Sequence, residues 1–439
     1  NILKMRNSAN DGWIDLRTLT GGLTSAADAT INSVNIGKGA NSVADNTVLG
    51  ENALDASVSG GGNTAIGKAA LGATTSGENN TAIGRQALAA NTTASNNTAV
   101  GAFTLDSNTT GTENTALGYL ALQANTTNGG NTAIGFAALD ANTTGANNTG
   151  VGRGVLGANT TGDSNTAVGQ NALDANTTAS NNTAVGQGSL GGCTEGHSNT
   201  AVGQGSAENI TTGDHNVAIG RNALGSQTTA DNNVAIGQSA LFDNTTGESN
   251  VAIGSNALDA NTTASNNVAI GVNSLGVNTT GTSNVAVGTN SLDANTDANN
   301  NTGVGYNSLT ANTTGSKNTA LGSATLAAST TADNNTAIGY LALTANTTGQ
   351  TNTAVGEEAL KSNTTANNNT AIGREALRLN TTGTQITAVG ANALMSFVSG
   401  TAQLTAVGYD ALKLCTTAYN TAVGWQAGDA ITTGQANVM

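Results

Sequence analysis

A glycine recurs every 17 residues along most of this chain. It closes a pentapeptide such as Asn80–Gly84, with the sequence N-T-A-I-G, and twenty successive intervals from Gly50 to Gly390 are all 17 residues long. Gly37 precedes Gly50 by 13 residues, and two more glycines follow at intervals of 18 and 16. A fixed period of this size is typical of solenoids. The series predicts about 24 turns of one unit.

Each unit has a fixed pattern, which we number from its recurring glycine. Position −3 is Thr or Val, −2 is Ala or occasionally Gly, −1 is Ile, Val or Leu, and +4 is almost always Leu. β-Branched residues on either side of a small one indicate a short strand with two unlike faces. Apolar runs of five residues or fewer, bounded by Gly, Asn and Thr, are too short for stable helices. We therefore expect an all-β fold, a parallel β-solenoid (β-roll or β-helix) with 17-residue coils.

Stacked coils place equivalent side chains above one another. We expect the −1 and +4 side chains to form apolar ladders inside a narrow solenoid, with each coil depending on its neighbours for stability. The repeated Asn residues at −4 and +7, such as Asn80 and Asn91, are expected to form amide ladders of the kind found in stacked strands. The predicted core residues are Ile66, Leu71, Ile83, Leu88, Ile219, Leu224, Ile236 and Leu241.

The small residue at −2 implies a close backbone approach, either by the opposite wall of the same coil or by another chain. A coil with so few large side chains makes a poor monomer, so we expect a symmetric homo-oligomer. The predicted interface residues are Ala82, Ala218, Ala235 and Ala252. The repeats divide the chain into an adaptor segment, residues 1–32, and a solenoid shaft, residues 33–439, of about 24 coils.

Composition narrows the possible functions. The chain has 439 residues, 58 glycines and no proline, so no backbone N–H group is lost from the stack. A formal net charge of −14 argues against nucleic-acid binding, which needs a basic surface. No apolar run is long enough to span a membrane. Unbroken 17-residue spacing leaves no room for the insertions that an enzyme of this architecture needs, so we expect neither catalysis nor a cofactor.

Three local patterns are candidates for binding. Cys193, Glu195 and His197 alternate in one corner, although no neighbouring coil supplies further ligands. Asp214, Asp231 and Glu248 recur at intervals of 17 and form a weak candidate for a cation site, with solvated side chains as the expected alternative. Position +1 carries six of the eleven aromatic residues and is either a stripe that contacts a receptor or glycan, or an exposed ladder.

The pentapeptide with its following Ala-Leu resembles the repeats of phage tail-fibre-type proteins. It is also similar to the head repeats of YadA-like trimeric autotransporter adhesins, most closely at Asn32–Gly37 and Asn216–Gly220. Those heads have coils of 14 or 15 residues, so the corners here are longer. The segment Asn10–Leu16 resembles one that precedes such repeats in phage fibres.

The resemblance implies a homotrimeric, non-enzymatic fibre that spaces and supports host attachment. It would belong to a virion, contact other virion or surface proteins at its ends, and meet a host-surface glycan or receptor. The alternative is a bacterial adhesin at the cell surface whose solenoid stalk or head binds a host or matrix.

Overall fold

The computed structural model describes residues 4–6, 13–15, 28–400 and 403–439. Strands β1 (Lys4–Arg6) and β2 (Trp13–Asp15) pair with each other in antiparallel fashion. Of the segment that resembles phage fibres, residues 10–12 and 16 lie outside the described residues. The chain divides into two compact units, Asn1–Asn148 and Thr149–Met439, and the coils of both follow the same plan.

Besides β1 and β2, the described residues of the first unit form short strands and a 3₁₀ turn. These elements are β3 (Ala29–Ile31), β4 (Val34–Gly37), η2 (Ala40–Ser42), β5 (Thr47–Gly50), β6 (Thr64–Ile66), β7 (Thr81–Ile83), β8 (Thr98–Val100), β9 (Thr115–Leu117) and β10 (Thr132–Ile134). Strands β5 to β10 pair in parallel, each with the strand of the next coil. This is the predicted parallel β-solenoid.

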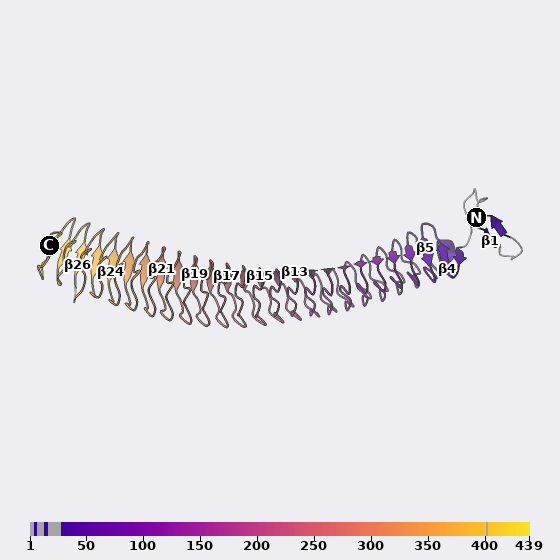
Figure 1. The fold of residues 1–439 in the computed structure, drawn as a ribbon, viewed down its shortest axis with the longest axis horizontal. Coiled ribbons are helices and arrows are strands. Elements are labelled where there is room, and N and C mark those ends of the chain that lie inside the picture. Colours follow the sequence, from indigo (N-terminus) through magenta and orange to yellow (C-terminus); the bar gives the residue numbers. More distant parts are fainter. Residues whose placement is uncertain (1–3, 7–12, 16–27, 401–402) are drawn as a thin grey trace. The chain divides into compact units, whose positions relative to one another are not determined.

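The described residues of the second unit form seventeen strands. They lie side by side in Figure 1. They are β11 (Thr149–Val151), β12 (Thr166–Val168), β13 (Thr183–Val185), β14 (Thr200–Val202), β15 (Val217–Ile219), β16 (Val234–Ile236), β17 (Val251–Ile253), β18 (Val268–Ile270), β19 (Val285–Val287), β20 (Thr302–Val304), β21 (Thr319–Leu321), β22 (Thr336–Ile338), β23 (Thr353–Val355), β24 (Thr370–Ile372), β25 (Thr387–Val389), β26 (Thr405–Val407) and β27 (Thr421–Val423). Their pairing is parallel and in register, so Ile219 lies beside Ile236.

The chain contains about 22 coils rather than the predicted 24. Strands β3, β4 and β5 pair in antiparallel fashion, and the parallel stack starts only at β5. Asn32 and Ser33 both have positive φ, 52° and 66°, which suits the tight two-residue turn between β3 and β4. Thirteen residues between Gly37 and Gly50 are too few for a full coil, so Gly37 belongs to this hairpin.

The prediction that the −1 side chains form a ladder inside the solenoid is wrong. The interior is narrower than that prediction requires. Ile83 and Ile219 are 37% and 38% exposed, and Ile66 and Ile236 are half-buried. A three-residue strand points its middle side chain one way and its outer two the other. Here the middle alanine points inward. The +4 ladder was predicted correctly, because Leu71, Leu88, Leu224 and Leu241 are fully buried.

The opposite wall of the same solenoid explains the small residue at −2. At Gly303, which replaces the alanine, an added Cβ would lie 2.7 Å from Ser291 Oγ and 3.4 Å from Leu292 Cγ. A methyl group at Gly303 would therefore require Ser291 to shift, so the opposite wall lies too close for a large side chain at this position. Ala82, Ala218, Ala235 and Ala252 are fully buried in the chain itself, so they are not available to another chain. Their assignment as an oligomer interface is wrong.

Buried asparagines connect the coils, as predicted. At −4, the backbone N–H of Asn97 donates to Asn80 Oδ1 (3.0 Å), and Asn80 Nδ2 donates to the carbonyl oxygen of Ala94 (2.9 Å). At +7, Asn261 Nδ2 donates to Asn244 Oδ1 (2.9 Å) in the preceding coil. Buried amides with satisfied donors and acceptors hold one arrangement, because any shift of a coil would leave polar groups unpaired.

The recurring glycine is required by the contact between coils. An added Cβ at Gly84 would lie 2.2 Å from the carbonyl oxygen of Gly101, and Gly84 has φ 141°. The leucine at +4 adopts the left-handed region, with φ 52° at Leu88, which is uncommon for such a residue. Its full burial offsets that strain.

Candidate functional site

In each unit, the outer side of the parallel strands forms a regular surface. We call the side chains at −3 and −1 of β5–β27 the outward face. Every −3 residue is Thr or Val and every −1 residue is Ile, Val or Leu, so the face carries no charge. Several −1 side chains are more than one-third exposed, among them Leu117, Ile219, Ile270 and Leu321. An exposed apolar surface of this regularity is typical of a surface that contacts another protein.

The corner with Cys193 does not form a nucleophile or a metal site. Cys193 occupies an Asn position in the +7 row, where its thiol is buried and donates to the carbonyl oxygen of Gly196 (3.3 Å). Burial raises the pKa of this thiol to about 11, so it is protonated at neutral pH. Glu195 and His197 are exposed, and His197 Nδ1 accepts a hydrogen bond from the backbone N–H of Ser180 (2.9 Å).

The acidic stack has a structural role that the sequence did not reveal. Asp214 Oδ1 accepts a hydrogen bond from the backbone N–H of His197 (2.6 Å), and Asp231 Oδ1 accepts one from Asp214 (2.7 Å). The N–H of Glu248 donates in turn to Ser265 Oγ (3.0 Å). Asp214, Asp231 and Ser265 thus each cap a backbone N–H group one coil earlier. The recurrence of Asp, Asn and Ser at +11 is the sequence pattern that could have predicted this capping role. Among the described residues, no group of three or more His, Cys, Asp or Glu is placed to hold a metal.

Acidic side chains at +5 lie in shallow hollows between corners. Asp174 and Glu208 line one of about 320 Å³, together with Gly188 and Gly191. Burial raises the pKa of Asp174, with a smaller contribution from the charge of Glu208. Burial likewise raises the pKa values of Asp106, Asp140, Asp259 and Asp293. A carboxylate directly above another would be more costly still, which explains why acids at +5 are never in adjacent coils.

Two basic residues at +5, Lys361 and Arg378, do lie in adjacent coils, and their charges are compensated. Lys361 Nζ is 2.7 Å from Glu358 Oε1, and Arg378 Nε is 2.7 Å from Glu358 Oε2. Arg378 also contacts Glu375 at 3.4 Å. The hydrogen bond from Lys361, followed by the charges of Arg378 and Lys361, lowers the pKa of Glu358.

Aromatic residues in the first unit pack on one another across coils. The ring centroids of Phe103 and Tyr119 are 6.0 Å apart in an edge-to-face arrangement, and those of Tyr119 and Phe136 are 5.6 Å apart and stacked. The guanidinium of Arg85 lies 5.1 Å from the Phe103 centroid. Because Tyr119 and Phe136, both in the +1 row, stack on each other, the ladder interpretation of this row is favoured here over a receptor stripe.

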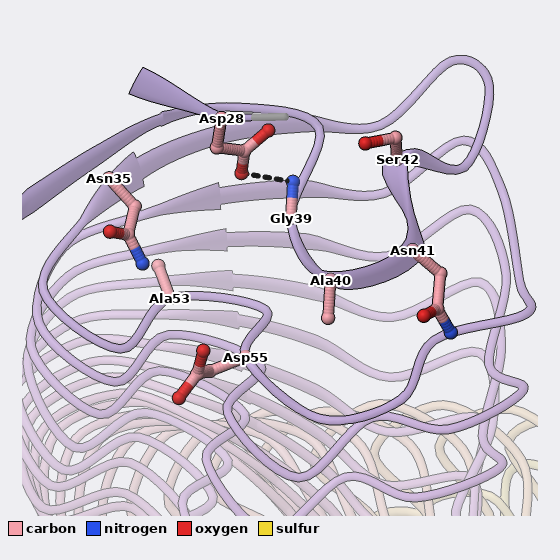
Figure 2. Close-up of a pocket in the computed structure, with 8 residues that line it drawn as sticks. All are labelled: Asp28, Asn35, Gly39, Ala40, Asn41, Ser42, Ala53 and Asp55. Atoms are coloured by element: carbon pink, nitrogen blue, oxygen red, sulfur yellow. Dashed lines mark hydrogen bonds between the residues drawn. The ribbon is translucent and has the colours of Figure 1, made fainter. Parts of the chain in front are cut away.

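We call the antiparallel strands β3, β4 and β5 the antiparallel cap. A hollow of about 260 Å³ lies beside it. Figure 2 shows the residues that line this hollow. Asp28 accepts hydrogen bonds there from the backbone N–H groups of Lys38 (2.7 Å) and Gly39 (2.6 Å). Gly39 has φ 79°, and an added Cβ would lie 2.8 Å from the carbonyl oxygen of Leu54. Asn41 Nδ2 donates to the carbonyl oxygen of Val58 (3.0 Å). These polar groups hold the cap against the first coil.

No protein-family model and no curated protein matches this chain. In the part of the chain that the structure describes, no helix is long and apolar enough to cross a membrane. The fold therefore defines the class: the chain is a parallel β-solenoid repeat protein with an uncharged outward face.

Proposed function

We propose that this protein is a non-enzymatic structural fibre. The observation that carries the proposal is the register of the coils within each unit, where backbone and asparagine hydrogen bonds join each layer to the next. Such a stack resists bending and local unravelling because every coil shares its bonds with two neighbours. Its polar corners are occupied by contacts that hold the coils together, which suits mechanical support.

The fibre is proposed to be a homo-oligomer that assembles through the outward face. An uncharged surface that repeats once per coil is buried along its whole length only by a partner with the same rise per repeat. A second copy of this chain has the same rise per repeat because its coils are identical. A trimer is the number that the resemblance to tail-fibre and adhesin repeats implies.

The proposed setting is a virion, where the fibre spaces an attachment tip from the particle and contacts other virion proteins at its ends. The tip or another segment, rather than the repeated corners, would recognise a host-surface glycan or receptor. This placement rests on the resemblance of the repeats to those of phage tail fibres.

Two measurements test the proposal. Light scattering coupled to size-exclusion chromatography of the purified chain should give three times the monomer mass, and a monomer at micromolar concentration would contradict the homo-oligomer. Immunogold electron microscopy of particles and cells from the source should label fibres on virions. Labelling confined to a cell envelope would instead favour the adhesin.

A further inference from the structure

Five successive strands differ from all the others on the outward face. Strands β15–β19 have valine at −3, whereas the other eighteen parallel strands have threonine there. The valines are Val217, Val234, Val251, Val268 and Val285, and the −1 residues beside them are Ile219, Ile236, Ile253, Ile270 and Val287. Each strand is in register with the next, so these ten side chains form one aliphatic array, the valine block.

The rest of the outward face does not specify how two copies align. Thr at −3 and an aliphatic residue at −1 recur from coil to coil, so two copies that slide by one coil exchange nearly identical contacts. Register is weakly specified on surfaces of this kind. An assembly of uniform coils would therefore populate several offsets.

We propose that the valine block is the surface on which a second copy of this chain docks in parallel, and that it sets the register of the fibre. The inference rests on the proposed homo-oligomer and adds its alignment. The block matches itself only when the copies are aligned. A slip by one coil brings a valine at each edge of the block against a threonine, and a slip by five leaves no valine matched.

The chemistry of this mismatch favours alignment. Valine and threonine have nearly the same shape, so both registers pack equally well. A threonine hydroxyl pressed against a valine methyl loses its water without gaining a hydrogen bond, which is unfavourable. In the aligned register valine meets valine, and threonine meets threonine with hydroxyls free to pair. The cost of slipping grows with the number of mismatched coils.

Cysteine cross-linking reports the register. Cys193→Asn and Cys415→Asn remove the native thiols and place asparagine in the +7 row, where it is the usual residue. In this background, differently tagged chains carrying Ile236→Cys or Ile253→Cys are refolded together, sized, and then mildly oxidised. Disulfides need a Cα separation below about 7 Å. Aligned parallel copies should give like-with-like cross-links at least tenfold more often than mixed ones.

The decisive variant replaces all five block valines with threonine. Its coils should stack normally, because threonine is the residue at −3 elsewhere, and it should still form oligomers. We expect its mixed cross-links to approach the like-with-like yield. The matched control, Val→Ile at the same five positions, keeps the array aliphatic and should behave like the parent.

The possible failures are distinct. A monomeric parent in the sizing step overturns both the homo-oligomer and the register proposal. An oligomeric parent whose threonine variant keeps a single register overturns the role of the block alone. An oligomer that forms cross-links between Ile253→Cys chains but none between Ile236→Cys chains is antiparallel about β17, which overturns the parallel alignment.

Discussion

Strands β15–β19 and β20–β24, both in the second unit, share one interior and differ on the outside. The inward alanine or glycine at −2, the leucine at +4 and the asparagine at −4 recur through both segments. On the outward face, the first has valine where the second has threonine. At the corners, the first carries Asp259 and Asp293 with pKa values raised by burial, and the second carries the ion pairs around Glu358.

The comparison of these two segments shows which positions of the coil tolerate substitution. In both segments the −2 position holds only alanine or glycine, because the opposite wall of the coil lies close to it. The outward face and the corners meet no such wall. Variation there is compatible with any function that needs the coils to stay uniform while the surface differs along the chain.

The largest expected effects come from the interior and should be the same in both segments. Leu258→Ala and Leu326→Ala each remove a fully buried side chain, and we expect each to cost about 2–5 kcal/mol. Alanine is compatible with the backbone, since Ala207 occupies this position at φ 51°. Denaturant unfolding of the full chain measures the two costs. A difference above about 1 kcal/mol would show that the two interiors are not equivalent.

Substitutions on the outward face should affect the two segments differently. Val251→Asp places a charge in the valine block, and Thr336→Asp places one at the same position in the second segment. An unpaired charge buried in an interface costs about 3–5 kcal/mol. We expect Val251→Asp to dissociate the oligomer at micromolar concentration and Thr336→Asp to weaken it less, as measured by light scattering. Circular dichroism should stay unchanged in both, since the −3 side chain lies outside the solenoid. An equal loss of association would remove the special role of the block.

Much of this comparison was visible in the sequence, and the reason is the period. A 17-residue repeat predicts the stacking, the register and the asparagine ladders, because equivalent residues must lie above one another. The sequence did not reveal which strand face is inside. Alternation over three residues fits either orientation, and isoleucine is more apolar than alanine. The choice depends on the distance to the opposite wall, which is set by left-handed turns at residues such as Leu88.

The corner contacts were missed for a related reason. Asp214 and Asp231 were recognised as a stack, but a carboxylate that caps a backbone N–H looks the same in sequence as one that faces water. The antiparallel cap was also missed, because Gly37 ends a strand of normal composition and only its 13-residue interval sets it apart.

A smaller effect is expected at the ion pairs of the second segment. The pKa of Glu358 is lowered in the folded protein, so its ionised form favours folding above the usual value of 4.5, and this contribution is lost as the pH falls through the lowered value. Glu358→Gln should destabilise the chain at pH 7 by about 0–1 kcal/mol, the range of exposed pairs. The difference from the parent should shrink near pH 3, as measured by urea unfolding. A difference that persists at pH 3 would mean that packing, rather than charge, is responsible.

The smallest effect, of opposite sign, is expected in the first segment. Burial raises the pKa of Asp293, so folding favours its protonated form and the carboxylate destabilises the chain once the pH rises above the raised value. Asp293→Asn should therefore stabilise the protein at pH 7, by no more than about 0.5 kcal/mol for a corner side chain. The gain should vanish below about pH 3, where the parent carboxyl is protonated in both states. Asp259→Asn, two coils away on the same hollow, is the matched variant, and it should give a gain of the same sign. If either substitution destabilises the chain at pH 7 and the loss persists in acid, the hollow depends on the shape of the aspartate and its charge is incidental.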